Sequence, residues 1–221
     1  MTLSRAFERN ADLCQPFLSV LPVTGAAISV LNSEMGQFTV SYTDDTAEWL
    51  DELQFDLGEG PCWDALSSRA PVLRPRVVEA GSEWPLFTNA VAGNRAVASM
   101  FAFPLALGTL EIGAVDLYTS TTIELDEAQV AKASDLATIA TWQVLRTILS
   151  TDAAILEGPV SSRREVHQAT GMILVQLGTS AEDALLLLRA HAFATGRSVL
   201  DVATDVVDRR LDFSAIERPT A

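Results

Sequence analysis

Four runs of apolar and β-branched residues in the first half of the chain predict two β-hairpins. The first pair covers 25–32 and 37–43 around a short polar stretch, which is typical of a hairpin turn. The second pair covers 96–107 and 110–120 and is broken at Gly108. A loop-rich insert with shorter helical pieces separates the pairs and contains LGEGPCWDAL (57–66), the strand candidate APVLRP (70–75) and WPLFTNAVAGNR (84–95). We therefore expect an antiparallel sheet with helical layers.

Helical spacing of apolar residues predicts a helix on either side of this region. An amphipathic opening helix is expected over roughly 4–20, and one long helix from Leu125 to about Ser150. The opening helix places on one side Leu3, Phe7, Leu13, Phe17 and Leu18. The long helix has a narrow seam of Val130, Ala133, Ala137, Ala140 and Val144. Such a seam packs on its own domain or on a copy of itself, so a homodimer through residues 125–150 stays open.

Three helix starts recur at intervals of 18 residues after Gly158 and Pro159. Each is a serine followed three residues later by an acid: Ser162 and Glu165, Ser180 and Asp183, Ser198 and Asp201. This pattern resembles a capping box, in which the serine oxygen accepts a hydrogen bond from a backbone N–H of the first helical turn. Gly178 and Gly196 stand where the first two helices should end. The pattern predicts a compact three-helix unit of about 55 residues.

The apolar positions of these helices predict the core of that unit. They are Val166, Ala169, Ile173 and Leu177 in the first helix, Ala184, Leu185, Leu188 and Ala192 in the second, and Val199, Val202, Ala203, Val206 and Val207 in the third.

The net charge of the chain is divided unevenly. The whole chain carries −14, from 15 basic and 29 acidic residues. Residues 158–221 hold seven arginines and eight acids, so nearly all of the negative charge, −13, belongs to residues 1–157. This negative charge excludes a uniformly basic nucleic-acid-binding surface, because phosphate contacts need lysine or arginine. The second part is nearly neutral, and its arginines suit phosphate and base contacts.

Few residues in the first part could support catalysis. The only histidines are His167 and His191, both in the helical unit, which excludes histidine-based catalytic pairs, histidine-ligated haem and the usual zinc sites from residues 1–150. Lys132 is the only lysine and follows no glycine-rich phosphate loop, so ATP is not an expected cofactor. The sensor cofactor or ligand stays unknown, and no metal is expected.

The sequence contains neither a membrane span nor a signal peptide pattern, so we expect a cytoplasmic protein. Its two cysteines fit a reducing compartment better than a disulfide framework.

A ligand site in the first part is expected around Cys62, Trp63 and Trp84. A cysteine that opens a short helix after a proline could have a lowered thiol pKa and act in redox sensing or ligand attachment. Two tryptophans in a loop-rich insert could form pocket walls. The competing interpretation is that all three residues are ordinary core.

The helix expected over 162–177 has a polar face that could meet a partner. At 100° per residue, Arg164, His167, Gln168, Gly171 and Val175 lie opposite the buried stripe. An outward glycine in mid-helix costs about 1 kcal/mol relative to alanine. Either a partner backbone approaches Gly171 closely, or the residue reflects drift on a merely solvated face.

Residues 162–211 closely resemble an ANTAR domain, the three-helix RNA-binding antiterminator module of bacterial regulators. The likeness rests on Ala169 and Gly171, the Gly178 turn, and the run from Arg197 to Ala203, together with Glu182, Ala184 and Leu188. Thr170 stands where the family commonly has a lysine that could meet phosphate. The resemblance and the face together make RNA-binding candidates of Arg163, Arg164, His167, Gln168, Thr170, Gly171, Arg189 and Arg197.

The first part resembles a GAF sensor domain, through the LGEGPCWDAL loop, the flanking strand pairs and the long helix that follows. The expected fold class is α+β: a GAF-like antiparallel sheet flanked by helices, a long connecting helix, and an all-α ANTAR bundle. The expected divisions are a sensor domain (1–150), a linker (151–160), an ANTAR domain (161–213) and a tail (214–221).

The resemblance implies a non-enzymatic regulator of transcription antitermination that binds paired RNA hairpins under control of a small-molecule or redox signal. Two hairpins suggest two ANTAR units. One alternative is a protein-interaction module that docks on a polymerase or partner regulator. Another is a thiol-dependent sulfoxide reductase using Cys14 and Cys62, because some GAF domains resemble free methionine sulfoxide reductases.

Overall fold

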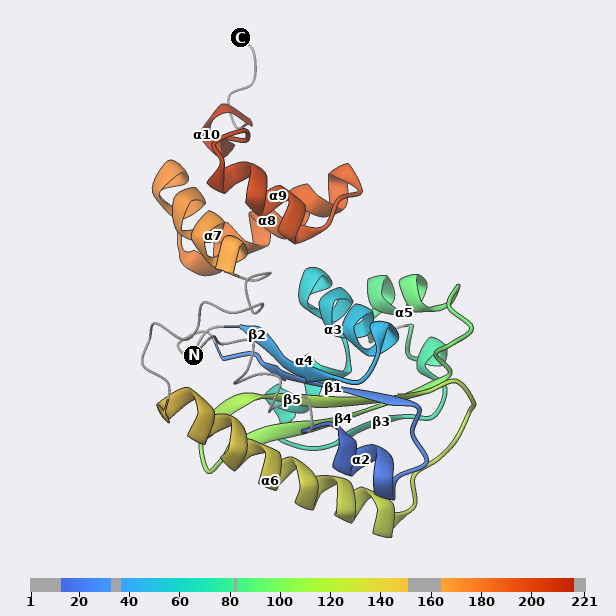
Figure 1. Ribbon diagram of the computed structural model, residues 1–221. Helices are drawn as coiled ribbons and strands as arrows, with labels where there is room; N and C mark the ends of the chain where they lie inside the picture. The colour runs from blue at the N-terminus through green and yellow to red at the C-terminus, as the bar shows by residue number, and fades with distance from the viewer. Residues whose placement is uncertain (1–12, 33–36, 82, 151–163, 217–221) are drawn as a thin grey trace. The chain divides into compact units, whose positions relative to one another are not determined.

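The structure, a computed structural model, describes residues 13–32, 37–81, 83–150 and 164–216 (Figure 1). The chain forms two compact units, Met1–Gly158 and Pro159–Ala221. Each unit has its own buried core. We therefore describe them one at a time.

A five-stranded sheet with the order β2-β1-β5-β4-β3 forms the centre of the first unit. All four strand pairings are antiparallel. The strands are β1 (Gly25–Val30), β2 (Phe38–Tyr42), β3 (Val72–Arg74), β4 (Ser99–Leu107) and β5 (Leu110–Thr119). Both predicted hairpins are confirmed, as β1–β2 and β4–β5, and the strand candidate at 70–75 is confirmed as β3.

Gly113 allows the central strands β1 and β5 to approach each other. It pairs with Val30 in the register, and a Cβ at Gly113 would lie 1.8 Å from the carbonyl oxygen of Ser29. Any side chain here would therefore push β1 away from β5.

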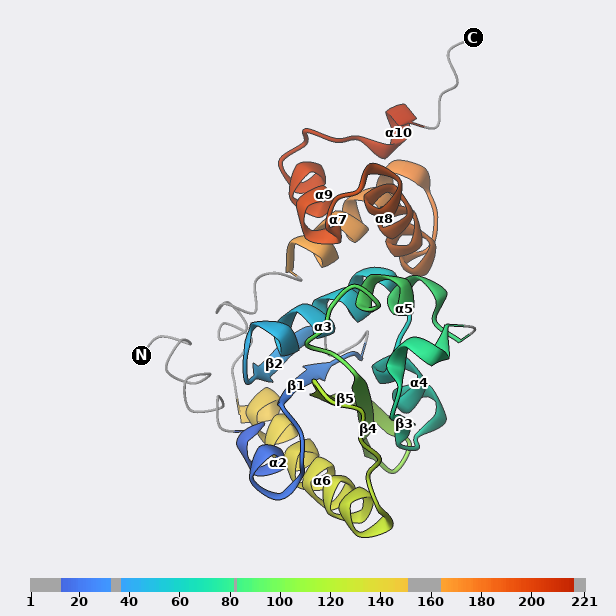
Figure 2. The same ribbon diagram turned by 90° about the vertical axis from the view of Figure 1, so that its right-hand side faces the viewer.

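Helices cover both faces of the sheet (Figures 1 and 2). One face carries α2 (Gln15–Val20) and α6 (Glu127–Ser150), and the other carries α3 (Asp45–Leu57), α4 (Pro61–Ser68) and α5 (Pro85–Val91). A short 3-10 helix, η1 (Val77–Ala80), precedes α5. Of the predicted opening helix, the described residues contain only α2, and Leu3 and Phe7 lie outside them.

The long helix α6 confirms the element predicted from Leu125 to about Ser150. Its predicted seam packs on its own unit, because Ala133, Ala137, Ala140 and Val144 are buried in a single chain, and α6 contacts β4 and α2. Val130, the first residue of the predicted seam, is only half-buried. The opposite side of α6 exposes Ile139, Trp142 and Leu149.

The second unit contains the three predicted helices: α7 (Arg164–Leu177), α8 (Ala181–Thr195) and α9 (Val199–Val207). Ser180 and Ser198 cap α8 and α9, since their hydroxyls accept the backbone N–H of Asp183 at 3.1 Å and of Asp201 at 3.0 Å. Gly178 and Gly196 both have φ 64° after α7 and α8, the left-handed conformation of a C-cap. Ser162 lies outside the described residues.

The predicted core of this unit is largely confirmed, with Leu177, Leu185 and Val207 only half-buried at its edge. A short additional helix, α10 (Phe213–Ile216), was not expected. Phe213 is buried, and its ring meets that of His191 edge to face at 5.4 Å. His191 is therefore part of the packing of α10.

Within the described ranges, no single helix is long and apolar enough to span a membrane. The pair α7 and α8 reaches that length and composition only when taken together, and the two helices are bent by 107°.

Candidate functional site

A buried carboxyl group, Asp116, interrupts the apolar run of β5 and faces α3. Its side chain is 6% exposed. Oδ2 accepts a hydrogen bond from Nε2 of Gln54 at 2.8 Å, and Oε1 of Gln54 accepts one from the backbone N–H of Cys62 at 2.9 Å. Oδ1 has no hydrogen-bond partner among the described residues. Burial, and then the charge of Asp51, raise the pKa of Asp116 to about 8.

Asp51 on α3 is a second buried carboxyl group close to the first. It accepts hydrogen bonds from the hydroxyls of Ser29 on β1 and Thr39 on β2, both at 2.5 Å. Both of these donors are neutral hydroxyls. Asp51 lies close enough to Asp116 for its negative charge to disfavour ionisation of the second acid.

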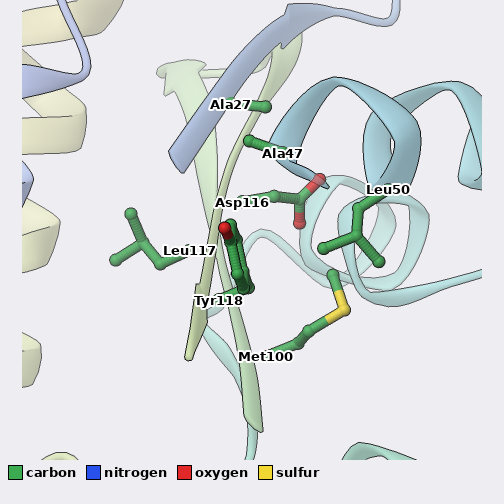
Figure 3. Close-up of a pocket in the computed structure, with 7 residues that line it drawn as sticks. All are labelled: Ala27, Ala47, Leu50, Met100, Asp116, Leu117 and Tyr118. Atoms are coloured by element: carbon green, nitrogen blue, oxygen red, sulfur yellow. The ribbon is translucent and has the colours of Figure 1, made fainter. Parts of the chain in front are cut away.

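Asp116 lies at a narrow pocket between the sheet and α3 (Figure 3). The space between these side chains is partly open to solvent, and no part of it is wide enough for a water molecule. In Figure 3 the carboxyl group of Asp116 points toward the side of Leu50 and Met100, whereas Leu117 points the other way. The lining consists of Ala27, Ala47, Leu50, Met100, Asp116, Leu117 and Tyr118.

The register explains the space beside Asp116. Its cross-strand neighbours are Ala27 on β1 and Ala102 on β4. Opposed side chains of an antiparallel pair lie about 5 Å apart at Cβ, so two alanines leave room that larger residues would fill.

The residues that the sequence suggested as ligand contacts do not line this pocket. Cys62 is buried with Leu31, Leu66 and Ala114. The indole N–H of Trp63 donates to the carbonyl of Gln54 at 2.8 Å, and that of the buried Trp84 donates to Asp64 at 3.0 Å. Trp63 and Trp84 thus act as packing residues of α3, α4 and α5. The Asp116 pocket was not predicted from the sequence, although Asp116 is the one acid in the middle of the apolar run 110–120, whose other acid, Glu111, lies near its start.

In the second unit, α7 presents the outward face that was predicted. His167, Gln168 and Gly171 are exposed, and Val175 is 78% exposed. A Cβ at Gly171 would meet nothing within 4 Å, so packing inside the unit does not require glycine there. The side chain of Arg164, and all of Arg163, lie outside the described residues.

The remaining RNA-binding candidates are held partly within the unit itself. The hydroxyl of the half-buried Thr170 donates to the carbonyl of Val166 at 2.7 Å. Arg197 forms an ion pair with Asp205 at 2.7 Å, to which Arg210 also binds. Hydrogen bonds from Arg210 and Arg197 lower the pKa of Asp205. Arg189 is half-buried on α8. His167, Gln168 and Gly171 are the described candidates that lie together on the exposed face of α7.

Comparison with protein families identifies the second unit. Residues 155–207 match the ANTAR domain. The chain therefore carries an ANTAR domain, and ANTAR domains form a family of RNA-binding antitermination regulators. Its α7 face, with Gly171 at the centre, is a face of this ANTAR domain.

Solved structures similar to the chain match its N-terminal region and include several GAF domains. The GAF domain of an Acinetobacter phosphoenolpyruvate-protein phosphotransferase has a TM-score of 0.52 and 10% identity, covering 69% of this chain and 88% of that one. A GAF domain/HD domain protein from Geobacter sulfurreducens has a TM-score of 0.50 and 17% identity, covering 69% and 98%. The first unit thus has the GAF fold. Among curated proteins, no sequence relative is found.

Proposed function

We propose that this chain is a signal-responsive transcription antitermination regulator that binds RNA hairpins through its ANTAR domain under control of the GAF-like unit. The observation that carries the proposal is Gly171 in the ANTAR domain. It is exposed in mid-helix, and nothing in the described unit occupies the place of its missing side chain. Such a residue lowers helix stability by about 1 kcal/mol, and close approach of an RNA backbone explains its presence.

The proposed RNA contacts centre on the α7 face. His167 and Gln168 lie about one helical turn before Gly171 on the same exposed face, and an imidazole and an amide can contact bases and phosphates. Arg164 was predicted on this face and Arg163 precedes it in the chain, so we include both as phosphate contacts. Arg189 and Arg197 add positive charge to the unit, and Thr170 offers its oxygen near Gly171.

Gel-shift titration with a paired-hairpin RNA tests this assignment in the full chain. Arg164→Ala and Gly171→Leu should each weaken binding at least tenfold. Arg76→Ala removes the same charge from an exposed arginine of the first unit, and Gly93→Leu adds the same side chain where nothing lies within 4 Å. These two controls should bind like the wild type. If Arg164→Ala and Gly171→Leu bind the RNA as tightly as the wild type does, this face is not the RNA-binding surface.

We further propose a homodimer that brings two ANTAR domains to the two hairpins. Because the predicted seam of α6 is buried in its own unit, the dimer would use the exposed side formed by Ile139, Trp142 and Leu149. A signal that changes the pairing or register of two α6 helices would then change the spacing of the ANTAR domains, by a shift between two arrangements.

The protein-interaction alternative has one observation in its favour. Leu186 and Phe193 are 63% and 65% exposed, and their seven-residue spacing puts them on one side of α8. If a protein uses this side, Phe193→Ser should abolish capture of that partner and leave hairpin binding unchanged. If Phe193→Ser instead weakens hairpin binding as Gly171→Leu does, this side of α8 belongs to the RNA interface.

The environment of Cys14 does not support the thiol-dependent reductase alternative. Its sulfur is fully buried and donates to the carbonyl of Ser41 at 3.5 Å. Burial raises the pKa of the Cys14 thiol to about 11, so the group stays protonated at neutral pH. A catalytic thiol needs the opposite shift. Thiol-dependent turnover that is lost in Cys62→Ser would revive this alternative.

A further inference from the structure

One oxygen of the Asp116 carboxyl group is a buried polar atom to which the described part of the chain donates no hydrogen bond. Oδ2 is held by Gln54, whereas Oδ1 has no hydrogen-bond partner among the described residues. A buried group of this kind lowers stability by about 1–3 kcal/mol. An apolar residue of the same size would avoid this cost, so the carboxyl group calls for another explanation.

The surroundings of Oδ1 restrict what could bind there. The other lining side chains are aliphatic, a thioether and Tyr118, with no basic residue among them. The hydroxyl of Tyr118 is already engaged, because it donates to Oδ1 of Asp44 at 2.8 Å. With the buried Asp51 close by, an anion would be repelled. The site therefore favours a group that donates hydrogen bonds, carries positive charge and has a hydrocarbon body.

We propose that the Asp116 pocket binds a small alkylammonium ion, whose N–H groups donate to Oδ1 and whose alkyl chain packs against Leu50 and Met100. The inference rests on the proposed sensor role of the first unit and names the chemical class of its signal.

Binding requires the pocket to widen, since it does not admit even a water molecule. Met100 is an unbranched thioether and adapts readily to a changed space. Ala47 and Leu50 both belong to α3, so a ligand between them and the sheet would displace that helix. Occupancy would thereby favour a second arrangement of α3, which is what a sensor needs.

Binding also releases a proton. At pH 7 Asp116 is mostly protonated, given its raised pKa. An alkylammonium keeps its own proton, as lysine does with a pKa of about 10.4, so the carboxyl group must lose its proton to form the ion pair. Among the described residues, the polar and titratable side chains around Asp116 are Asp51 and Gln54 of α3 and Tyr118 of β5. Gln54 in turn accepts a hydrogen bond from the backbone N–H of Cys62. Asp51 opposes this ionisation in the free protein, and the ligand's charge offsets it.

Isothermal titration calorimetry of the full chain tests the inference with isobutylammonium chloride and, as uncharged control, isobutanol. The ammonium should bind and the alcohol should not. Titrations in two buffers of different ionisation enthalpy should show release of about one proton per ligand at pH 7, from the pKa of about 8. Affinity should fall about tenfold for each pH unit below that pKa.

Asp116→Asn keeps the size of the side chain and removes its charge, so it should lose ammonium binding. Asp135→Asn makes the same change at an exposed position of α6 and should bind like the wild type. The inference is overturned if neither ligand binds, if alcohol and ammonium bind equally, or if Asp116→Asn binds normally.

Hairpin binding, measured in parallel on each variant, separates the two levels of the argument. If the wild-type protein binds hairpin RNA but not the ammonium ion, only this inference is contradicted. If the wild-type protein does not bind hairpin RNA, the proposed function is contradicted.

Discussion

At the scale of single residues, Asp116 makes the stability of the first unit depend on pH. Its pKa is about 8 in the folded protein, whereas the ordinary value, expected in the unfolded chain, is 3.8. Between these values the folded state binds the proton and the unfolded state does not. This contribution to stability is thus fully present below pH 4 and declines as the pH rises to 8, by at most about 1.4 kcal/mol per pH unit.

We expect Asp116→Asn to lack this decline. Urea unfolding between pH 5 and pH 8 should show the variant gaining stability over the wild type as the pH rises. Asp135→Asn, exposed on α6, should follow the wild type at every pH. A constant difference between Asp116→Asn and wild type would mean that Asp116 ionises normally in the fold.

Gly171 should show opposite effects on stability and on RNA binding. Its Cβ position is empty and its backbone is helical, so Gly171→Ala should raise the free energy of unfolding of the ANTAR domain by about 0.5–1 kcal/mol. The same variant should bind hairpin RNA more weakly in a gel shift. Gly178→Ala is the matched control: with φ 64° it should destabilise the domain. An alanine at 171 that leaves RNA affinity unchanged would assign the glycine to drift.

At the scale of elements, β1 and β5 depend on one glycine. Gly113→Ala would place a methyl group 1.8 Å from a backbone oxygen of β1, which no side-chain rotation can relieve. We expect a loss of about 3 kcal/mol, at the upper end of overpacking costs, measured by thermal unfolding. Gly93→Ala, which meets nothing within 4 Å, should change stability little. Similar stabilities for both variants would show that β1 yields more easily than its pairing indicates.

The exposed side of α6 carries the prediction about self-association. Trp142 is 56% exposed, and Leu149 is 81% exposed on the same helix. If two copies meet here, Trp142→Glu should shift the protein to monomer in sedimentation velocity while circular dichroism stays unchanged. Lys132→Glu, a charge change at an exposed position nearer the start of α6, serves as control. A wild-type monomer at all concentrations would contradict the proposed dimer.

At the scale of the whole molecule, the division of charge predicts electrostatic self-restraint. Residues 1–157 carry −13 and should repel RNA, whereas residues 158–221 carry −1. The fragment 158–221 should therefore bind non-specific RNA more tightly than the full chain at low salt. Salt should reduce this difference, because the Debye length shortens from about 30 Å at 0.01 M to about 8 Å at 0.15 M. Equal affinities at low salt would rule out restraint by charge.

Local chemistry explains what the sequence by itself determined. Serine caps, C-cap glycines and apolar spacing act within a few residues of one another, so they predicted α8 and α9, the outward Gly171 and both hairpins. The division of charge also follows from the residues alone. The family resemblance added the ANTAR and GAF assignments, which residue spacing does not contain.

Only the tertiary structure decided which surfaces remain free. Both sides of α6 carry apolar residues at helical spacing, and only packing against β4 and α2 shows that the alanine seam is inside and Trp142 outside. The Asp116 pocket likewise depends on the pairing of β5 with Ala27 and Ala102 and on α3 lying above them. These contacts join residues far apart in the chain, and spacing along the sequence carries no information about such distances.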